Sequence, residues 1–288
     1  MTVDKITEGY TLIEGPVWHP DRGLIFSDVH GGGIYAVTAN GAVSTVFEHR
    51  RGVGGMAIHE AGGLIVSGRN IAYKAFDGSP TVELLAQDPS IGPAGFNDIT
   101  TDAAGRIYAG ELGASPFAED GGTVPGELWM IDLDGSSQVV GTDVLLTNGL
   151  GFSPDHKTLY HSDSPRSAVM QYPVHDDATL GPKTLFADMV RGRPDGLVVS
   201  EDGAVWVALA GGGAGVGVYE PTGELRTHID IPLPMCTSVC FGGDNLTDLW
   251  IVSGSVDAES DRAGAVFVTE TEVAGLPVAP CRVALPSH

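Results

Sequence analysis

Four oxygen-bearing side chains hold corresponding places in the sequence: Glu14, Asp98, Asn148 and Asp195. Each lies seven residues before a polar turn signal, the signals beginning at Asp21, Gly105, Asp155 and Asp202. Carboxylate and carboxamide oxygens are the ligands that hard divalent cations prefer. Carboxylates that converge repel one another and lose hydration, and a bound cation offsets both costs. The spacing therefore predicts one divalent metal ion. Ca²⁺ is expected first, and Zn²⁺, Mn²⁺, Mg²⁺ and Fe²⁺ are also compatible with such ligands.

Each of these residues also has a simpler interpretation. Asn148 is followed by Gly149, and Asn-Gly by itself is a turn signal. Asp-Gly and Glu-Gly pairs at strand starts are equally ordinary turn chemistry. The recurrence of oxygen-bearing residues at one position in several segments favours a shared site over unrelated turns.

A repeat runs through the whole chain and would position these residues. Six copies of an apolar segment, a polar turn and a second apolar segment follow one another, with turn signals 41 to 50 residues apart. A third and often a fourth apolar segment complete each copy. Four strands per unit of this length are typical of a propeller blade. The chain is thus predicted to be all-β, a six-bladed β-propeller with four antiparallel strands per blade, forming a single domain over residues 1–288.

The first strand of a propeller blade lines the central channel, so the predicted ligands would form a ring at one mouth of that channel. The loop after each second strand should lie at the same mouth. These loops carry His30, Arg69, Asp163 and Arg166, which we expect to contact a substrate unless they are ordinary solvated charges. The long segment 111–126 is expected to act as a lid.

The composition excludes several classes of function. The formal net charge is −22 with only 15 Lys and Arg residues, which argues against a nucleic-acid partner because phosphates require a basic surface. No apolar stretch reaches membrane-spanning length. The first ten residues show no signal peptide. The spacing of the three cysteines fits neither a disulfide framework nor a metal motif. A cytoplasmic protein with a small-molecule partner is expected, and its oligomeric state is left open.

Several stretches resemble one known family. They are EGPVW, FND, TNGLGFSPD, HSDS, RPDGLVVSEDG and CFGGDN, in this order along nearly the whole chain. They are similar to the SMP-30/gluconolactonase/luciferin-regenerating-enzyme family, also called regucalcin-like. The resemblance implies a six-bladed propeller with one divalent metal at the channel mouth, and many members of this family hydrolyse sugar lactones. It also implies that Glu14, Asn148 and Asp195 are the metal ligands.

The resemblance further implies that Asp195 is a catalytic base and that Asn97 lies near metal and substrate. Asn97 and its neighbour Asp98 are both candidates for substrate contact, and which of them faces the ion is left open. Sugar lactonases of this family often have Arg where this chain has Gly95. Ser115 lies near the position of an acidic substrate contact. A sugar lactone and a smaller or more apolar lactone therefore both remain candidate substrates.

The predicted activity is metal-dependent hydrolysis of a lactone to a hydroxy acid. Asp195 would take a proton from the attacking water, and Asn97 would orient the water or the carbonyl. Two alternatives remain open, namely a metal-stabilised binding propeller without turnover and another metal-dependent esterase or isomerase at the same site. The chain contains no Gly-x-Ser-x-Gly nucleophile motif and no complete zincin motif.

Overall fold

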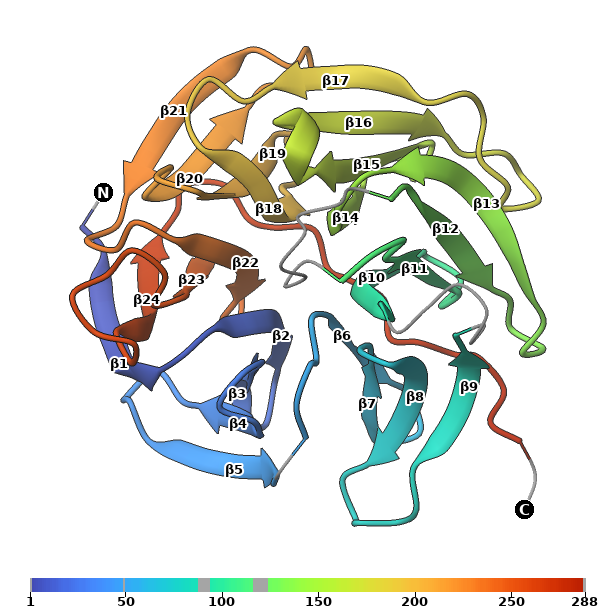
Figure 1. Ribbon diagram of the computed structural model, residues 1–288, viewed down its shortest axis with the longest axis horizontal. Coiled ribbons are helices and arrows are strands. Elements are labelled where there is room, and N and C mark those ends of the chain that lie inside the picture. Colours follow the sequence, from blue (N-terminus) through green and yellow to red (C-terminus); the bar gives the residue numbers. More distant parts are fainter. Residues whose placement is uncertain (1, 49, 88–93, 116–123, 287–288) are drawn as a thin grey trace.

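The computed structural model describes residues 2–48, 50–87, 94–115 and 124–286. Six four-stranded antiparallel sheets are arranged as blades around a central axis (Figure 1). Apart from the short 3₁₀ helix η1 (Ser164–Arg166), the regular structure of the described residues is β-strand. The predicted six-bladed β-propeller is confirmed.

Blades one to three follow one another along the chain. Blade one contains β2 (Ile13–His19), β3 (Gly23–Asp28), β4 (Ile34–Val37) and β5 (Val43–Phe47). Blade two contains β6 (Met56–His59), β7 (Gly63–Val66), β8 (Asn70–Ala75) and β9 (Val82–Ala86). Blade three contains β10 (Phe96–Thr101), β11 (Ile107–Glu111), β12 (Gly126–Ile131) and β13 (Ser137–Val144).

Blades four and five repeat this pattern, and blade six differs from it. Blade four contains β14 (Thr147–Phe152), β15 (Thr158–Asp163), β16 (Ala168–Pro173) and β17 (Thr184–Asp188). Blade five contains β18 (Arg193–Val199), β19 (Val205–Ala210), β20 (Gly215–Tyr219) and β21 (Leu225–Asp230). Blade six contains β22 (Cys236–Gly242), β23 (Asp248–Ser253), β24 (Gly264–Glu270) and the N-terminal strand β1 (Asp4–Tyr10).

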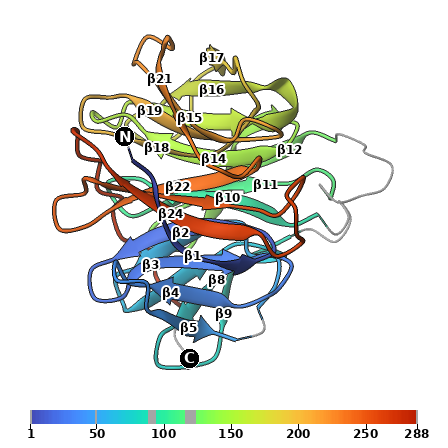
Figure 2. The same cartoon turned by 90° about the vertical axis from the view of Figure 1, so that its left-hand side faces the viewer.

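The ring is closed by pairing of the two ends of the chain. Strand β1 is antiparallel to β24 and forms the outer edge of blade six, as Figures 1 and 2 show. The repeat pattern does not predict this strand, because the partner of β1 lies more than 250 residues away. Because β1 belongs to blade six and is followed in the chain by β2 of blade one, its pairing joins the first and last blades.

The apolar core is divided among the contacts between neighbouring blades. One buried cluster, for example, joins Ile25 and Ile34 of blade one to Leu64 and Val66 of blade two. Similar clusters occupy the other five blade contacts, including that between blades six and one. The middle strands are buried on both faces, as in β3 and β7. A blade therefore cannot bury its apolar faces alone and is stable only beside its neighbours.

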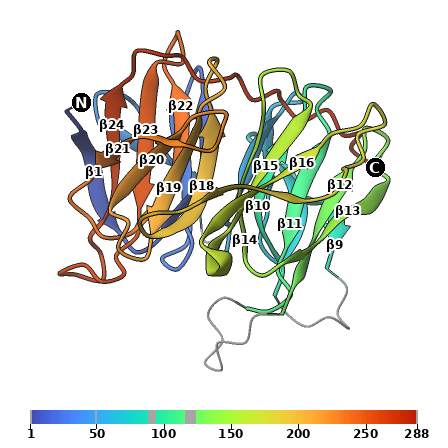
Figure 3. The ribbon, with the colours of Figure 1, turned by 90° about the horizontal axis from the view of Figure 1, so that it is seen from above.

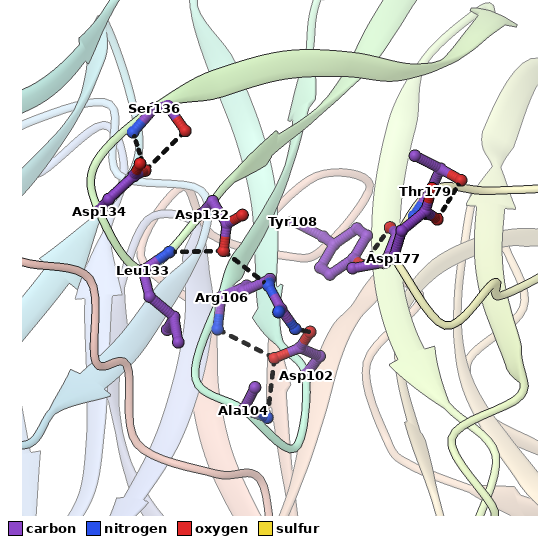
Figure 4. A network of polar contacts seen from close by, with 11 residues as sticks. Asp102, Ala104, Arg106, Tyr108, Asp132, Leu133, Asp134, Ser136, Asp177 and Thr179 are labelled. Atoms are coloured by element: carbon purple, nitrogen blue, oxygen red, sulfur yellow. Dashed lines mark hydrogen bonds and ion pairs between the residues drawn. The ribbon is translucent and has the colours of Figure 1, made fainter.

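Side chains in the polar turns of the repeat form hydrogen bonds with backbone N–H groups at the far end of the inner strands. In blade three, Asp102 Oδ1 accepts hydrogen bonds from the backbone N–H groups of Ala104 and Arg106, both at 2.9 Å. The Arg106 guanidinium then bridges Asp102 and Asp132 at 3.0 and 2.8 Å (Figure 4). Tyr108 donates from its hydroxyl to the Ala178 carbonyl at 2.7 Å and ties blade three to blade four. These contacts are structural and lie outside the predicted site.

The C-terminal segment crosses the face of the ring where these turns lie (Figure 3). The backbone N–H of Leu276 donates to Val199 in blade five, and that of Cys281 donates to Ile58 in blade two. Leu276 and the four residues after it line a cavity of about 310 Å³ below the inner strands. The described part of the chain contains no helix long and apolar enough to cross a membrane. The cytoplasmic location stays a prediction.

Glycines allow the inner strands to approach one another closely around the axis. A Cβ on Gly149 would lie 2.2 Å from the backbone nitrogen of Leu197 in the next blade. A Cβ on Gly55 would lie 2.6 Å from the backbone nitrogen of Ile99. Backbone atoms held by sheet pairing cannot rotate away from such contacts, so side chains at these positions would push the blades apart.

We expect Gly149→Ala to lower the free energy of unfolding by about 2 kcal/mol or more, because overpacking against fixed backbone costs roughly this much. Chemical denaturation followed by fluorescence measures the change. Gly141→Ala is the matched control, since its Cβ would meet only side-chain atoms, the nearest being Leu128 Cβ at 3.3 Å. Equal stabilities of the two variants would contradict the close-approach argument.

Candidate active site at the channel mouth

One cavity joins the predicted site residues. Its volume is about 870 Å³, and its wall includes Glu14 of β2, Asn97 of β10, Asn148 of β14 and Asp195 of β18. All four residues lie at or near the start of an inner strand. The propeller therefore brings together side chains from four blades that are far apart in the sequence.

All four of these inner strands contain a β-bulge at the site; in β2 it begins one residue after Glu14, whereas in the other three strands it begins at the site residue itself. Between two successive residue pairs, β14 advances by three residues, from Thr147 to Leu150, whereas its partner strand β15 advances by only two, from Asp163 to His161. Strands β10 and β18 show the same irregularity at corresponding places. The extra residues begin with Asn97, Asn148 and Asp195. Bulges re-aim side chains and are common beside active sites, and here they direct these three side chains to the cavity.

The bulges also distinguish the positions of Asn97 and Asp98. The turns after β10, β14 and β18 each contain a residue of positive φ, namely Gly105, His156 and Gly203. Counted back eight residues from these anchors, the corresponding positions are Asn97, Asn148 and Asp195. The turn signals Asp155 and Asp202 lie one residue before their anchors, whereas Gly105 is itself the anchor, so counting back seven residues leads to Asp98 in blade three and not to Asn97.

A chain of hydrogen bonds fixes the two carboxamides. Asn97 Nδ2 donates to the Thr147 carbonyl at 2.8 Å and to Asn148 Oδ1 at 2.5 Å. Asn148 Nδ2 donates to Ser164 Oγ at 2.6 Å, and Ser164 Oγ donates to the Pro194 carbonyl at 2.5 Å. Both N–H groups of the Asn97 carboxamide are therefore engaged, and only its oxygen can meet a further ligand.

The orientation of Asn148 leaves two acceptors facing each other. Turning its amide over would place the nitrogen 3.1 Å from Asp195 Oδ1, so in the present orientation the Asn148 oxygen faces that carboxylate oxygen. The turned amide would instead oppose the Asn97 nitrogen at 2.5 Å, donor against donor. It would also require Ser164 to donate to Asn148 at the expense of Pro194. Two oxygens in this arrangement fit a cation held between them.

The carboxylates of Glu14 and Asp195 are electrostatically unfavourable without a partner. Burial, together with the charges of Asp195 and Asp98, raises the pKa of Glu14 well above its ordinary value. Burial and the charge of Asp98 likewise raise the pKa of Asp195, which a hydrogen bond from the Gly196 backbone opposes in part. A divalent ion would favour the ionised form of both groups.

The donor set is consistent with a hard divalent ion. Among the described residues, no three or more His, Cys, Asp and Glu side chains form a group arranged to hold a metal. A ligand set at this mouth would combine the carboxylates of Glu14 and Asp195 with the amide oxygen of Asn148. Such oxygen-only sets suit Ca²⁺ or Mg²⁺ better than soft metals.

Asp98 faces a different environment from Asn97. It lines the smaller cavity beside the C-terminal segment, together with Gly149 and Phe241. Its Oδ2 is buried and has no hydrogen-bond partner among the described residues. Burial raises the pKa of Asp98 to about 7. The predicted substrate contact of Asp98 is thus not supported by its position.

The remaining predicted substrate contacts divide into two groups. Arg69 lines the large cavity. Asp163 is fully buried and forms an ion pair with Arg166, which also pairs with Asp143 at 2.8 Å. Neither member of this pair lines the cavity, and its role in the structure is to hold the loop after β15. His30 is exposed and also does not line the cavity.

The lid predicted over residues 111–126 lies partly outside the described residues, since 116–123 are not described. Glu111, at the start of this segment, is buried and accepts a hydrogen bond from Trp129 Nε1 at 2.7 Å. Two contributors were not predicted from the sequence, namely Ser164 and the cavity-lining Arg51. Ser164 is the last residue of the HSDS stretch that the family resemblance included, but no role was assigned to it, and no motif marked Arg51.

A six-bladed propeller with clustered oxygen donors at one channel mouth defines the structural class. A family model described as "SMP-30/Gluconolactonase/LRE-like region" matches residues 12–255, and the chain belongs to this family. The predicted family is thereby confirmed.

Similar proteins include 6-deoxy-6-sulfogluconolactonase of Pseudomonas putida, which is 33% identical over 92% of each chain. Pentonolactonase XacC of Haloferax volcanii is 28% identical, over 96% of this chain and 97% of that protein. Among solved structures, luciferin-regenerating enzyme superimposes with a TM-score of 0.88 at 24% identity, covering 98% of this chain and 99% of the other.

The buried Asp98 should make stability depend on pH in a defined direction. Its folded-state pKa of about 7 lies above the ordinary aspartate value of 3.8. The resulting stabilisation is complete below the unfolded pKa and is lost as pH rises through about 7. Because a change of one in a pKa corresponds to about 1.4 kcal/mol, raising the pKa from 3.8 to about 7 corresponds to about 4 kcal/mol of stability.

We therefore expect the wild-type protein to lose up to about 4 kcal/mol of stability relative to Asp98→Asn between pH 4 and pH 8, in the presence of chelator. Urea denaturation of both proteins across this range measures the difference, and the comparison cancels the titration of surface carboxylates. A difference that stays constant with pH would show that Asp98 titrates normally.

Proposed function

We propose that this protein is a metal-dependent lactonase that opens a sugar lactone to a hydroxy acid. The observation that carries the proposal is the convergence of Glu14, Asn148 and Asp195 on one cavity, with an Asn148 oxygen facing an Asp195 oxygen. The two relatives named as sugar lactonases, each matched over more than nine tenths of its length, support the reaction class.

Glu14, Asn148 and Asp195 would hold one divalent ion, with Ca²⁺ as the first expectation because all three donors are oxygens. When bound, the ion supplies positive charge that polarises the lactone carbonyl and stabilises the negative charge developing on its oxygen. The hydrogen-bond chain through Asn97 and Ser164 fixes the amide of Asn148 with its oxygen toward the site.

Asp195 is the proposed general base. In the ionised form, which a bound cation would favour, its carboxylate can accept a proton. It takes the proton from the attacking water, and the lactone ring opens when the carbonyl carbon–ring oxygen bond breaks. The ring oxygen then receives a proton and becomes the hydroxyl group of the product.

The role of Asn97 is narrower than the sequence predicts. Both of its N–H groups are already donated within the protein, so it cannot donate to the lactone carbonyl. Its oxygen can accept a hydrogen bond from the attacking water or from a substrate hydroxyl. We therefore assign Asn97 to orienting the water and holding Asn148.

The cavity suits a sugar-sized substrate. Its volume of about 870 Å³ lies within the range of small-molecule sites. The wall also includes Asn70, Gln87 and Arg69, which can bond to hydroxyl groups, together with apolar residues. Gly95 lies beside Arg69, since a Cβ on Gly95 would be 3.3 Å from Arg69 Cα, and Arg69 is therefore a candidate for the contact that the family resemblance assigns to an Arg at position 95.

We expect Asp195→Asn to lower kcat/KM for gluconolactone by about 100-fold or more, as loss of a general base typically does. Hydrolysis is followed by acid release, after subtraction of the spontaneous rate. Asp98→Asn is the informative comparison, because it removes a buried carboxylate on the inner strand of blade three that faces the other cavity. It should retain most of the activity. Equal losses in both variants would contradict the assignment of the base.

Calcium should stabilise the protein through Glu14, independently of turnover. Ca²⁺ at 100 times its Kd is expected to raise the free energy of unfolding by about 2.7 kcal/mol, and Glu14→Gln should abolish most of this gain. Thermal unfolding with Ca²⁺ or chelator measures it. Stabilisation without turnover of any lactone or ester would favour a binding protein, and turnover of other esters alone would favour an esterase.

A further inference from the structure

Three arginines gather at one side of the large cavity. Arg51 and Arg69 line its wall. Arg50 is half-buried behind them, and its pKa is lowered by burial and by the nearby charge of Arg69. The three come from two different loops, the connection before β6 and the turn between β7 and β8. They therefore form a cluster through the fold and not merely along the sequence.

The arginine cluster lacks acidic partners. Within the described ranges, no carboxylate forms an ion pair with Arg50, Arg51 or Arg69, and the buried Arg50 Nε has no hydrogen-bond partner. Glu83 also lines the cavity, but it is held by the Asn70 amide. The chain has 37 acidic and 15 basic residues. The chain thus has an excess of acids, yet none of them pairs with these three neighbouring arginines within the described residues.

The backbone places these arginines firmly. Gly33 N–H donates to the Arg50 carbonyl at 2.7 Å, and Gly52 N–H donates to the Val29 carbonyl at 3.1 Å. The segment that carries Arg50 and Arg51 is thus fastened to the loop after β3.

Arg69 is held in a similar way. The preceding Gly68 exchanges two backbone hydrogen bonds with Phe96, at 2.7 and 3.1 Å. Like charges that repel each other are therefore kept close by bonds that do not involve their side chains.

We propose that this cluster binds an oxyanion of the substrate, so that the preferred lactone carries a carboxylate or a sulfonate away from its reacting carbonyl. This inference rests on the proposed lactonase function and adds a substrate class to it. A guanidinium binds planar or tetrahedral oxyanions through two parallel hydrogen bonds. The glutamate and aspartate of the metal site lie in the same cavity and bind the opposite charge. The two groups thus orient a substrate with its anionic end at the arginines and its lactone carbonyl at Glu14 and Asp195.

The test compares three lactones: gluconolactone and the same lactone with a carboxylate or a sulfonate at its terminal carbon. For the wild type we expect kcat/KM to be about 10- to 100-fold higher for at least one anionic lactone, as charge-assisted hydrogen bonds imply. The combined Arg51→Gln, Arg69→Gln variant should lose this preference, with KM rising at least about 10-fold more for the anionic lactones than for gluconolactone. The preference should also fall with added salt.

Arg22→Gln is the matched control. Arg22 lies at the opposite end of blade one, in the turn between β2 and β3, with its guanidinium 4.2 Å from the Phe76 ring centre. The Arg22→Gln substitution removes one positive charge without touching the cavity and should leave the preference for anionic lactones intact. No preference in the wild type, or equal losses on neutral and anionic lactones in the double variant, would overturn the proposal.

A second measurement separates this inference from the proposed reaction. If no lactone is hydrolysed, calorimetric titration with the ring-opened carboxylate and sulfonate acids still tests the arginine cluster. Binding to the wild type that is lost in the double variant would support an anion site while the lactonase assignment fails. Absence of binding together with turnover of neutral lactone would refute the anion site and leave the reaction intact.

Discussion

The close approach of the six inner strands around one axis is the constraint on which this structure depends. At Gly149 and Gly55 the next blade's backbone lies where a Cβ would be. Between blades three and four the contact is polar, since Asn97 donates to the Thr147 carbonyl. The shared apolar clusters between blades hold the ring at this spacing. A looser ring would separate the site residues, because each comes from a different blade.

The same closeness creates the chemistry of the site. The inner strands that converge on the axis surround Glu14, Asp98 and Asp195, and burial raises the pKa values of all three carboxyl groups. A cation would offset this cost, which fits the proposed ligand set of two carboxylates and one neutral amide. The C-terminal segment covers the other face and leaves Asp98 in the small cavity. The two ends of the channel thus have different roles.

Much of the fold was predictable because the repeat is local. Each inner strand, turn and second strand lie within about 15 residues, and turn residues such as Asp102 and Asp155 satisfy nearby backbone groups. The N-terminal strand β1 was not predictable in this way, because its only partner is at the other end of the chain. Asp163 and Arg166 have the residue types of substrate contacts, yet they pair with each other, which only their relative positions reveal.

The sequence by itself determined the propeller, its family and the identities of Glu14, Asn148 and Asp195 as site candidates, because blade strands, turns and motifs repeat at short range. Only the tertiary structure decided that Asn97, not Asp98, faces the cavity. A β-bulge shifts the side-chain alternation by one residue, and a bulge is defined by pairing with a neighbouring strand, which residue spacing does not contain. The arginine cluster likewise exists only because two loops from neighbouring blades meet at one cavity.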